Sequence, residues 1–136
     1  MRTRAFIVVA SCLLAVLTAC GGRKSPSTYV YVAYEADSGR SVTMRVDDEL
    51  RVILAENRST GYLWSVVTND EDVLAQDGDP SYVVKGNAIG AGGEATFTFR
   101  AAGPGTSALL MINARPSSTE AVTPDRTFAL SVDVIE

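Results

Sequence analysis

The chain has 136 residues, enough for one domain, and a formal net charge of −4. An acidic chain is a poor partner for nucleic acid and adsorbs weakly to anionic lipid headgroups, so we expect neither interaction. Histidine is absent and the only cysteines are Cys12 and Cys20, which excludes histidine-based proton transfer and imidazole metal sites.

The first 20 residues have the pattern of a bacterial lipoprotein signal. Arg2 and Arg4 form a positive region, and residues 5–17 are an apolar stretch too short to span a bilayer comfortably. Leu17-Thr18-Ala19-Cys20 then resembles a lipobox, whose cysteine receives a diacylglycerol before cleavage. The alternative is an ordinary secretory signal that happens to contain a cysteine. We expect residues 1–19 to be a signal peptide and Cys20 to be lipidated, anchoring the protein at the cell membrane or the outer membrane, facing outside the cytoplasm.

Removal of residues 1–19 would leave 117 of the 136 residues, with a net charge near −6 because Arg2 and Arg4 are lost. Residues 20–28 would form the lipidated N-terminus and a linker, and residues 29–136 the domain. That domain has no thiol for a disulfide, a metal or a nucleophile. A domain of this size buries roughly two-thirds of its unfolded surface, so its core can stabilise the fold. We expect a monomer without a cofactor or a metal.

Beyond the linker, apolar and polar residues alternate with a period of two, which is typical of strands with one buried face. Val42, Met44 and Val46, for example, alternate with Thr43 and Arg45. In chain order, the predicted strands cover residues 29–35, 42–46, 50–56, 62–68, 80–85, 96–101, 106–113 and 127–134. No segment has the pattern of a helix. Seven or eight short strands separated by turn signals predict an all-β fold, an immunoglobulin-like antiparallel β-sandwich.

Two acidic clusters, Asp47-Asp48-Glu49 and Asp70-Glu71-Asp72, lie in or beside predicted turns. Their carboxylates lack the staggered spacing of a calcium loop, so we interpret them as solvated charge. A glycosidase needs two carboxylates across a deep cleft, which a small sandwich rarely supplies. With neither histidine nor a free thiol in the domain, we expect that the chain is not an enzyme.

Three loop motifs carry the functional information. They are Asn57-Arg58-Ser59-Thr60-Gly61-Tyr62, followed by Trp64; then Gly90-Ala91-Gly92-Gly93; then Arg115-Pro116. In the same order, they resemble the Asn-Pro-Thr-Thr-Gly-Tyr/Phe-x-Trp segment, the glycine-rich hairpin and the Arg-Pro-Trp motif of chagasin-type inhibitors of papain-like cysteine peptidases. Each motif alone is weak, and their shared order gives the resemblance its weight. The resemblance extends from Gly39 to Glu136.

Each motif also has a purely structural interpretation. Ser59-Thr60-Gly61 fits a tight turn in which Gly61 supplies a positive φ, and the second motif fits a plain glycine hairpin. We interpret Trp64 as a core residue on a central strand rather than a contact, because sandwiches often have a tryptophan there. Tyr62 would help to fix the first loop.

The resemblance implies that the three loops lie at one end of the sandwich and enter the active-site cleft of a papain-like cysteine peptidase together. Ser59 and Thr60 would cover the catalytic cysteine without presenting an aligned scissile bond. The segment Gly90 to Gly93 would offer backbone groups to the cleft wall as a substrate strand does. Arg115 and Pro116 would press on the other side. A rigid scaffold lowers the ordering cost of binding, so such inhibition can be tight and reversible.

Two positions depart from the family pattern. Arg58 stands where proline is usual, so the first loop is expected to lose a fixed φ and some stiffness. Ser117 stands where the family has an aromatic residue, and a buried aromatic anchor is often worth about 2 kcal/mol or more. We therefore expect weaker inhibition than by a full-motif inhibitor, or a preference for other peptidases. The same departures leave open a second function, a non-inhibitory binding or structural lipoprotein of the cell envelope.

Overall fold

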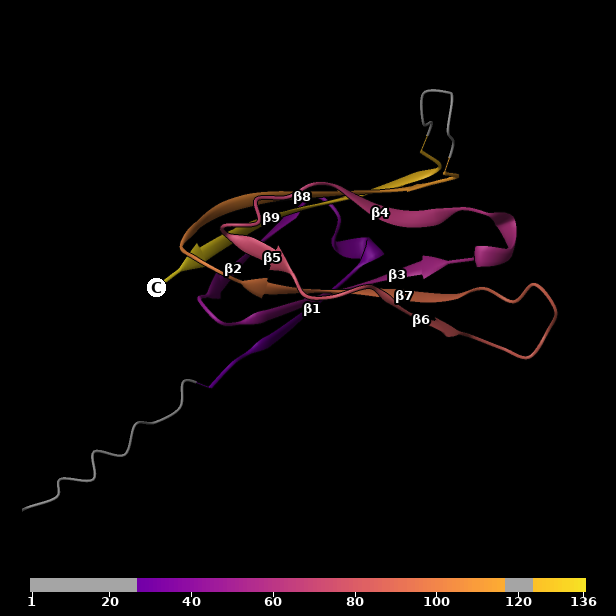
Figure 1. Ribbon diagram of the computed structural model, residues 1–136, viewed down its shortest axis with the longest axis horizontal. Helices are drawn as coiled ribbons and strands as arrows, with labels where there is room; N and C mark the ends of the chain where they lie inside the picture. Colours follow the sequence, from indigo (N-terminus) through magenta and orange to yellow (C-terminus); the bar gives the residue numbers. More distant parts are fainter. Residues whose placement is uncertain (1–26, 117–123) are drawn as a thin grey trace, which may run out of the picture.

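The computed structural model describes residues 27–116 and 124–136. They form two β-sheets packed face to face (Figure 1). One sheet has the strand order β1-β3-β7-β5, with β6 also paired to β7, and the other has the order β2-β9-β8-β4. The strands are β1 (Val30–Tyr34), β2 (Arg40–Arg45), β3 (Glu49–Glu56), β4 (Leu63–Thr68), β5 (Leu74–Gln76), β6 (Ser81–Val84), β7 (Gly93–Ala101), β8 (Gly105–Ala114) and β9 (Arg126–Ile135). The predicted all-β, immunoglobulin-like sandwich is confirmed.

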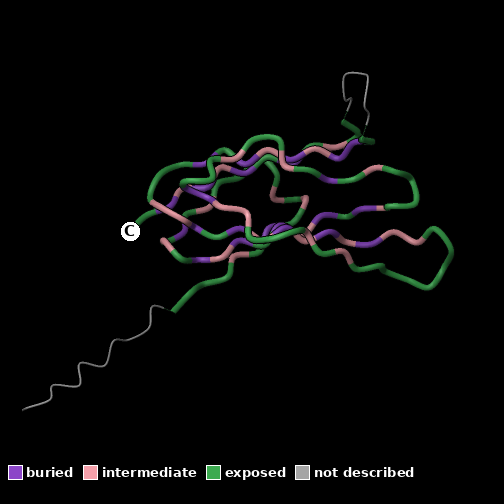
Figure 2. Tube along the Cα trace, viewed as in Figure 1, coloured by how far each residue is buried: buried purple, intermediate pink, exposed green. Residues whose placement is uncertain are grey.

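The alternating side chains of the two sheets meet in one core. β7 buries every second residue from Gly93 to Ala101, and β9 does so from Phe128 to Val134. Buried segments face each other across the sandwich, while the loops are exposed (Figure 2). Trp64 is 5% exposed and belongs to this core, and its indole N–H donates a hydrogen bond to the carbonyl of Ala55 at 2.9 Å. The prediction that Trp64 is a core residue is therefore confirmed, but the prediction that its strand is central is wrong, because β4 lies at the edge of its sheet.

Two strand pairs are parallel, although the sheets were predicted to be antiparallel. β1 runs parallel to β3, and β2 runs parallel to β9. After β1 the chain turns through a short 3₁₀ helix, η1 (Glu35–Asp37), and β2 joins the opposite sheet. β1 and β3 are therefore neighbours that point the same way, because the intervening strand lies in the other sheet. Alternation predicts which face a residue occupies, but it does not predict the direction of the neighbouring strand.

The acidic segments differ from the prediction in two respects. β5 lies between the predicted strands 62–68 and 80–85, where no strand was predicted. Val73 and Leu74 are buried there, and Leu74 to Gln76 pair with β7. Asp48 was interpreted as solvated, yet it is 2% exposed and accepts hydrogen bonds from the backbone N–H groups of Tyr29 and Arg45. Its carboxylate fixes the β2–β3 turn. Within the described ranges, no group of three or more acidic, histidine or cysteine side chains could hold a metal ion.

The strand directions place the loops with the three motifs at one end of the sandwich, and the start of β1 and the end of β9 at the other. β3, β6 and β8 all finish at the same end, whereas β1 begins and β9 finishes at the other (Figure 1). No helix among the described residues is long and apolar enough to cross a bilayer. The division into residues 1–19, 20–28 and 29–136 stays a prediction, and Cys20 lies outside the described residues.

Candidate functional site

Three connections meet at one end of the sandwich (Figure 1). The first loop, residues 57–62, joins β3 to β4, and the second loop, residues 85–92, joins β6 to β7. The third, of which residues 115, 116, 124 and 125 are described, joins β8 to β9. These are the loops that contain the three sequence motifs. The surface that they form together is called the loop edge below.

The first loop is a closed turn organised by Asn57. A 3₁₀ helix, η2 (Arg58–Thr60), begins after Asn57, whose side-chain oxygen accepts hydrogen bonds from the Ser59 N–H at 3.1 Å and the Ser59 hydroxyl at 2.7 Å. The Thr60 hydroxyl donates to the Asn57 carbonyl at 2.7 Å. Gly61 ends the helix with φ of 81°, a backbone conformation that glycine adopts without steric cost. Ser59, Thr60 and Gly61 are thus exposed on a turn whose hydroxyls are already hydrogen-bonded.

The second loop is joined to the first by Asn57 as well. The Asn57 side-chain amide donates a hydrogen bond to the Gly90 carbonyl at 3.1 Å. Gly90 has φ of 77°, and a Cβ built on it would lie 3.7 Å from the Ser59 hydroxyl oxygen. Gly92 packs beside the start of the first loop, since its Cβ would lie 3.6 Å from the Glu56 carbonyl oxygen. The glycines let the two loops lie against each other over several residues.

The third loop contacts the first through Arg115. Its Nε donates a hydrogen bond to the Thr60 carbonyl at 3.2 Å, and its guanidinium carbon lies 4.7 Å from the centroid of the Tyr62 ring. Tyr62 was predicted to help to fix the first loop, and in the structure its ring also contacts the third loop through Arg115. Pro116 is exposed beside Arg115, and Ser117 lies outside the described residues. The motif residues of all three loops, apart from Ser117, are thereby brought to one edge.

The family model of the chagasin family peptidase inhibitors I42 matches residues 43–132 of the sequence. This match spans β3 to β8, half of β2 and most of β9, and so includes all three loops. The chain belongs to the chagasin family of peptidase inhibitors. No curated protein matches it significantly in sequence.

Solved structures with the same fold include other inhibitors. The cysteine protease inhibitor EhICP2 from Entamoeba histolytica is 18% identical, with a TM-score of 0.71 over 82% of this chain and 100% of that chain. Amebosin is 24% identical, with a TM-score of 0.63 over 79% and 98%. PbICP-C, whose structure was solved in complex with falcipain-2, is 18% identical, with a TM-score of 0.51 over 82% and 93%. At these identities the likeness establishes the fold of this chagasin-family chain.

Arg58, which replaces the family's proline, is held by contacts that the sequence did not predict. Its Nε donates a hydrogen bond to a carboxylate oxygen of Glu56 at 2.9 Å, and its guanidinium carbon lies 4.1 Å from the centroid of the Tyr82 ring. The Tyr82 hydroxyl donates to the Glu56 carbonyl at 3.2 Å. The prediction of a less stiff loop considered only the backbone. The side chain of Arg58 constrains the loop in a different way.

The prediction from the sequence was incomplete for Ile89, in the second loop, and for Gly93, directly after it. Ile89 was not singled out, yet its side chain is fully exposed beside Gly90. An isoleucine within a glycine-rich segment was the available signal, because residues 86–93 contain no other large apolar side chain with which it could pack. Gly93 was predicted to offer its backbone to the peptidase together with Gly90 to Gly92, but it is buried and begins β7. The two residues therefore differ in what a substitution would disturb.

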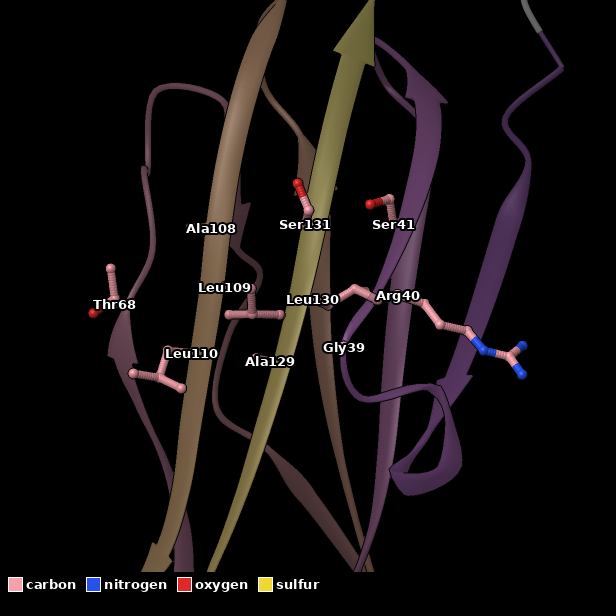
Figure 3. A pocket seen from close by; sticks show the side chains of 10 residues that line it. All are labelled: Gly39, Arg40, Ser41, Thr68, Ala108, Leu109, Leu110, Ala129, Leu130 and Ser131. Atoms are coloured by element: carbon pink, nitrogen blue, oxygen red, sulfur yellow. The ribbon is translucent and has the colours of Figure 1, made fainter.

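A hollow on the molecule lies away from the loop edge. It has a volume of about 390 Å³ and lies over the outer face of β2, β9, β8 and β4 (Figure 3). Short side chains on three neighbouring strands leave this space, among them Ser41, Ala108 and Ala129. None of the loop-edge motif residues lines it. In this chagasin-family chain the candidate site is thus a projecting edge and not this concavity.

Proposed function

We propose that the chain is a reversible inhibitor of papain-like cysteine peptidases, and that the loop edge enters the active-site cleft of the peptidase. Membership of a peptidase inhibitor family supports the activity. The observation that carries the mode of binding is the pair of hydrogen bonds that joins the three loops, from Asn57 to Gly90 and from Arg115 to Thr60. Loops that are already ordered lose little conformational entropy when they bind.

The first loop would lie over the catalytic cysteine. Peptidases bind substrates as extended strands, whereas Arg58 to Thr60 form a 3₁₀ turn closed by a left-handed glycine. Cleavage would require this turn to open, and opening would break the hydrogen bonds that Asn57 makes to Ser59 and Thr60. The turn would therefore occupy the cleft without being cut.

The second and third loops would contact the cleft on either side of the turn. Gly90, Ala91 and Gly92 lack large side chains, so a partner backbone could approach them closely. Ile89 offers the fully exposed apolar side chain of this loop, and burying it in the cleft would add binding free energy. On the other side Arg115 and Pro116 are exposed, with Arg115 already oriented by Tyr62 and Thr60.

The anchor and the location are further parts of the proposal. The lipobox-like segment ending at Cys20 supports lipidation, and the protein would then face outside the cytoplasm, bound to the cell membrane or the outer membrane. Mass spectrometry of the mature N-terminus would detect the diacylglyceryl group directly. Replacement of Cys20 by serine should release the protein from the membrane fraction, and a Cys20→Ser variant that stays membrane-bound would refute the anchor.

Titration of residues 25–136, which contain the whole sandwich, against papain and a cathepsin L-like peptidase tests the inhibitory function. We expect competitive, reversible inhibition with one inhibitor bound per active site. Absence of inhibition at micromolar concentration would refute it and would favour the second function, a non-inhibitory binding lipoprotein. That alternative rests on Ser117, which lacks the aromatic anchor of the family pattern.

A further inference from the structure

Glu56 is a carboxylate on the inward face of a strand. In β3 the inward positions are Leu50, Val52 and Leu54, and the next inward position is Glu56. Its side chain is only 2% exposed. A carboxylate in such a place is costly unless its oxygens are hydrogen-bonded and its charge is compensated.

Arg58 compensates that charge among the described residues. One Glu56 oxygen accepts from Arg58 Nε at 2.9 Å, and the other accepts from the Trp64 backbone N–H at 2.8 Å. Arg58 in turn lies over the Tyr82 ring, and the Tyr82 hydroxyl donates to the Glu56 carbonyl. The contacts therefore form a closed ring that joins the first loop to β3, β4 and β6.

We propose that three residues, Arg58, Glu56 and Tyr82, act as positioning residues for inhibition. They hold the turn from Asn57 to Gly61 in its binding conformation, and together they are called the latch below. The proposal rests on the proposed inhibitory function. A proline at position 58 would fix one backbone angle. The latch instead fixes the loop through a side chain held by residues of β3 and β6, the two strands that flank β7.

The backbone geometry and the latch make opposite predictions about a proline at position 58. Asn57 is extended, with φ of −123° and ψ of 94°, as a residue before proline prefers to be, and position 58 is the first of the helix, where proline is favoured. Backbone geometry thus predicts that Arg58→Pro stiffens the loop and improves inhibition. The latch predicts that the same change weakens inhibition, because it leaves the buried Glu56 carboxylate without its cation.

A double-mutant cycle separates these predictions. The wild type, Arg58→Pro, Glu56→Gln and the double variant are compared by their inhibition constants against papain and by amide hydrogen exchange of residues 57–62 without peptidase. Arg58→Pro should weaken inhibition about tenfold and speed exchange in the loop. In the Glu56→Gln background the same change should cost much less, since a neutral amide needs no cation.

Arg100→Ala is the matched control. It removes an exposed arginine paired with Asp47 at 3.4 Å, at the end of the sandwich away from the loop edge, and should leave inhibition and loop exchange unchanged. If Arg58→Pro does not fold, Arg58→Gln, which keeps length without charge, takes its place in the cycle.

The outcomes are distinct. Equal or tighter inhibition by Arg58→Pro would overturn the latch, as would a loss of inhibition that is the same with and without the Glu56→Gln substitution. If the wild type itself fails to inhibit, the proposed function is overturned, while faster loop exchange in Arg58→Pro but not in the double variant still supports the latch as a device that orders the turn.

Discussion

Gly92 and Gly93 are adjacent glycines with different roles, and alanine substitution should separate them. A Cβ at Gly93 would lie 2.7 Å from Tyr82 Cζ and 2.8 Å from its hydroxyl oxygen, and closer still to the Val83 carbonyl oxygen. The Val83 carbonyl and the Tyr82 ring both belong to β6, which pairs with the start of β7. A Cβ at Gly92 would lie 3.6 Å from its nearest neighbour, an ordinary contact.

Gly93→Ala should therefore push β6 away from β7. Overpacking of this kind costs about 1–3 kcal/mol, which lowers the melting temperature by roughly 5–15 °C for a domain near 100 residues. Gly92→Ala should change the free energy of unfolding by no more than about 0.5 kcal/mol. Inhibition by Gly92→Ala should change little as well, because the added methyl group would lie against Glu56 and Asn57 of the first loop at ordinary contact distances.

Thermal unfolding followed by circular dichroism measures the change in stability, and inhibition of papain measures the change in binding to a peptidase. Tyr82 also lies under Arg58, so Gly93→Ala should disturb the first loop in addition to the fold. Equal melting temperatures for the two variants would refute the assignment of Gly93 to strand packing. Inhibition weakened as strongly by Gly92→Ala as by Gly93→Ala would refute the different roles of the two glycines.

Three further substitutions test individual contacts of the loop edge. Asn57→Ala removes the helix cap and the bond to Gly90, so we expect a loss of about 1 kcal/mol in stability and weaker inhibition; a variant that melts and inhibits like the wild type would show that Asn57 does not couple the loops. Ile89→Ser should keep the melting temperature of the wild type and weaken inhibition about tenfold, and an unchanged inhibition constant would place Ile89 outside the contact. Ser117→Trp should tighten inhibition by roughly 2 kcal/mol, or about thirtyfold, and no gain would argue against a contact of residue 117 with the cleft.

Much of the sandwich could be predicted from the sequence because a half-buried strand imposes a period of two on its residues. β3, β7 and β9 show that period over eight to ten residues and were predicted within a few residues of their bounds. β5 has only three residues, too few for a period to be visible. The parallel pairs depend on the crossing of the chain between sheets after β1, which no local pattern encodes.

The candidate site also has a part that could be predicted from local sequence and a part that could not. Its loops could be located because their sequences resemble the motifs of a known family, and because turns favour glycine and asparagine. The latch could not be predicted, since Glu56, Arg58 and Tyr82 come together only when β6 lies beside β7. Position 56 did continue the inward alternation of Leu50, Val52 and Leu54, and a carboxylate at such a position was the sign that a cation had to lie nearby.

The start of β1 and the end of β9 both lie opposite the loop edge, and this placement governs how the domain can be attached to other molecules. A group joined upstream of β1, or to the residue that follows β9, leaves the three loops free to bind. Two copies joined in tandem by a flexible linker could therefore engage two peptidase molecules held on one surface. The second binding event would then be intramolecular, and its strength would be set by the length of the linker and no longer by the bulk concentration of the inhibitor.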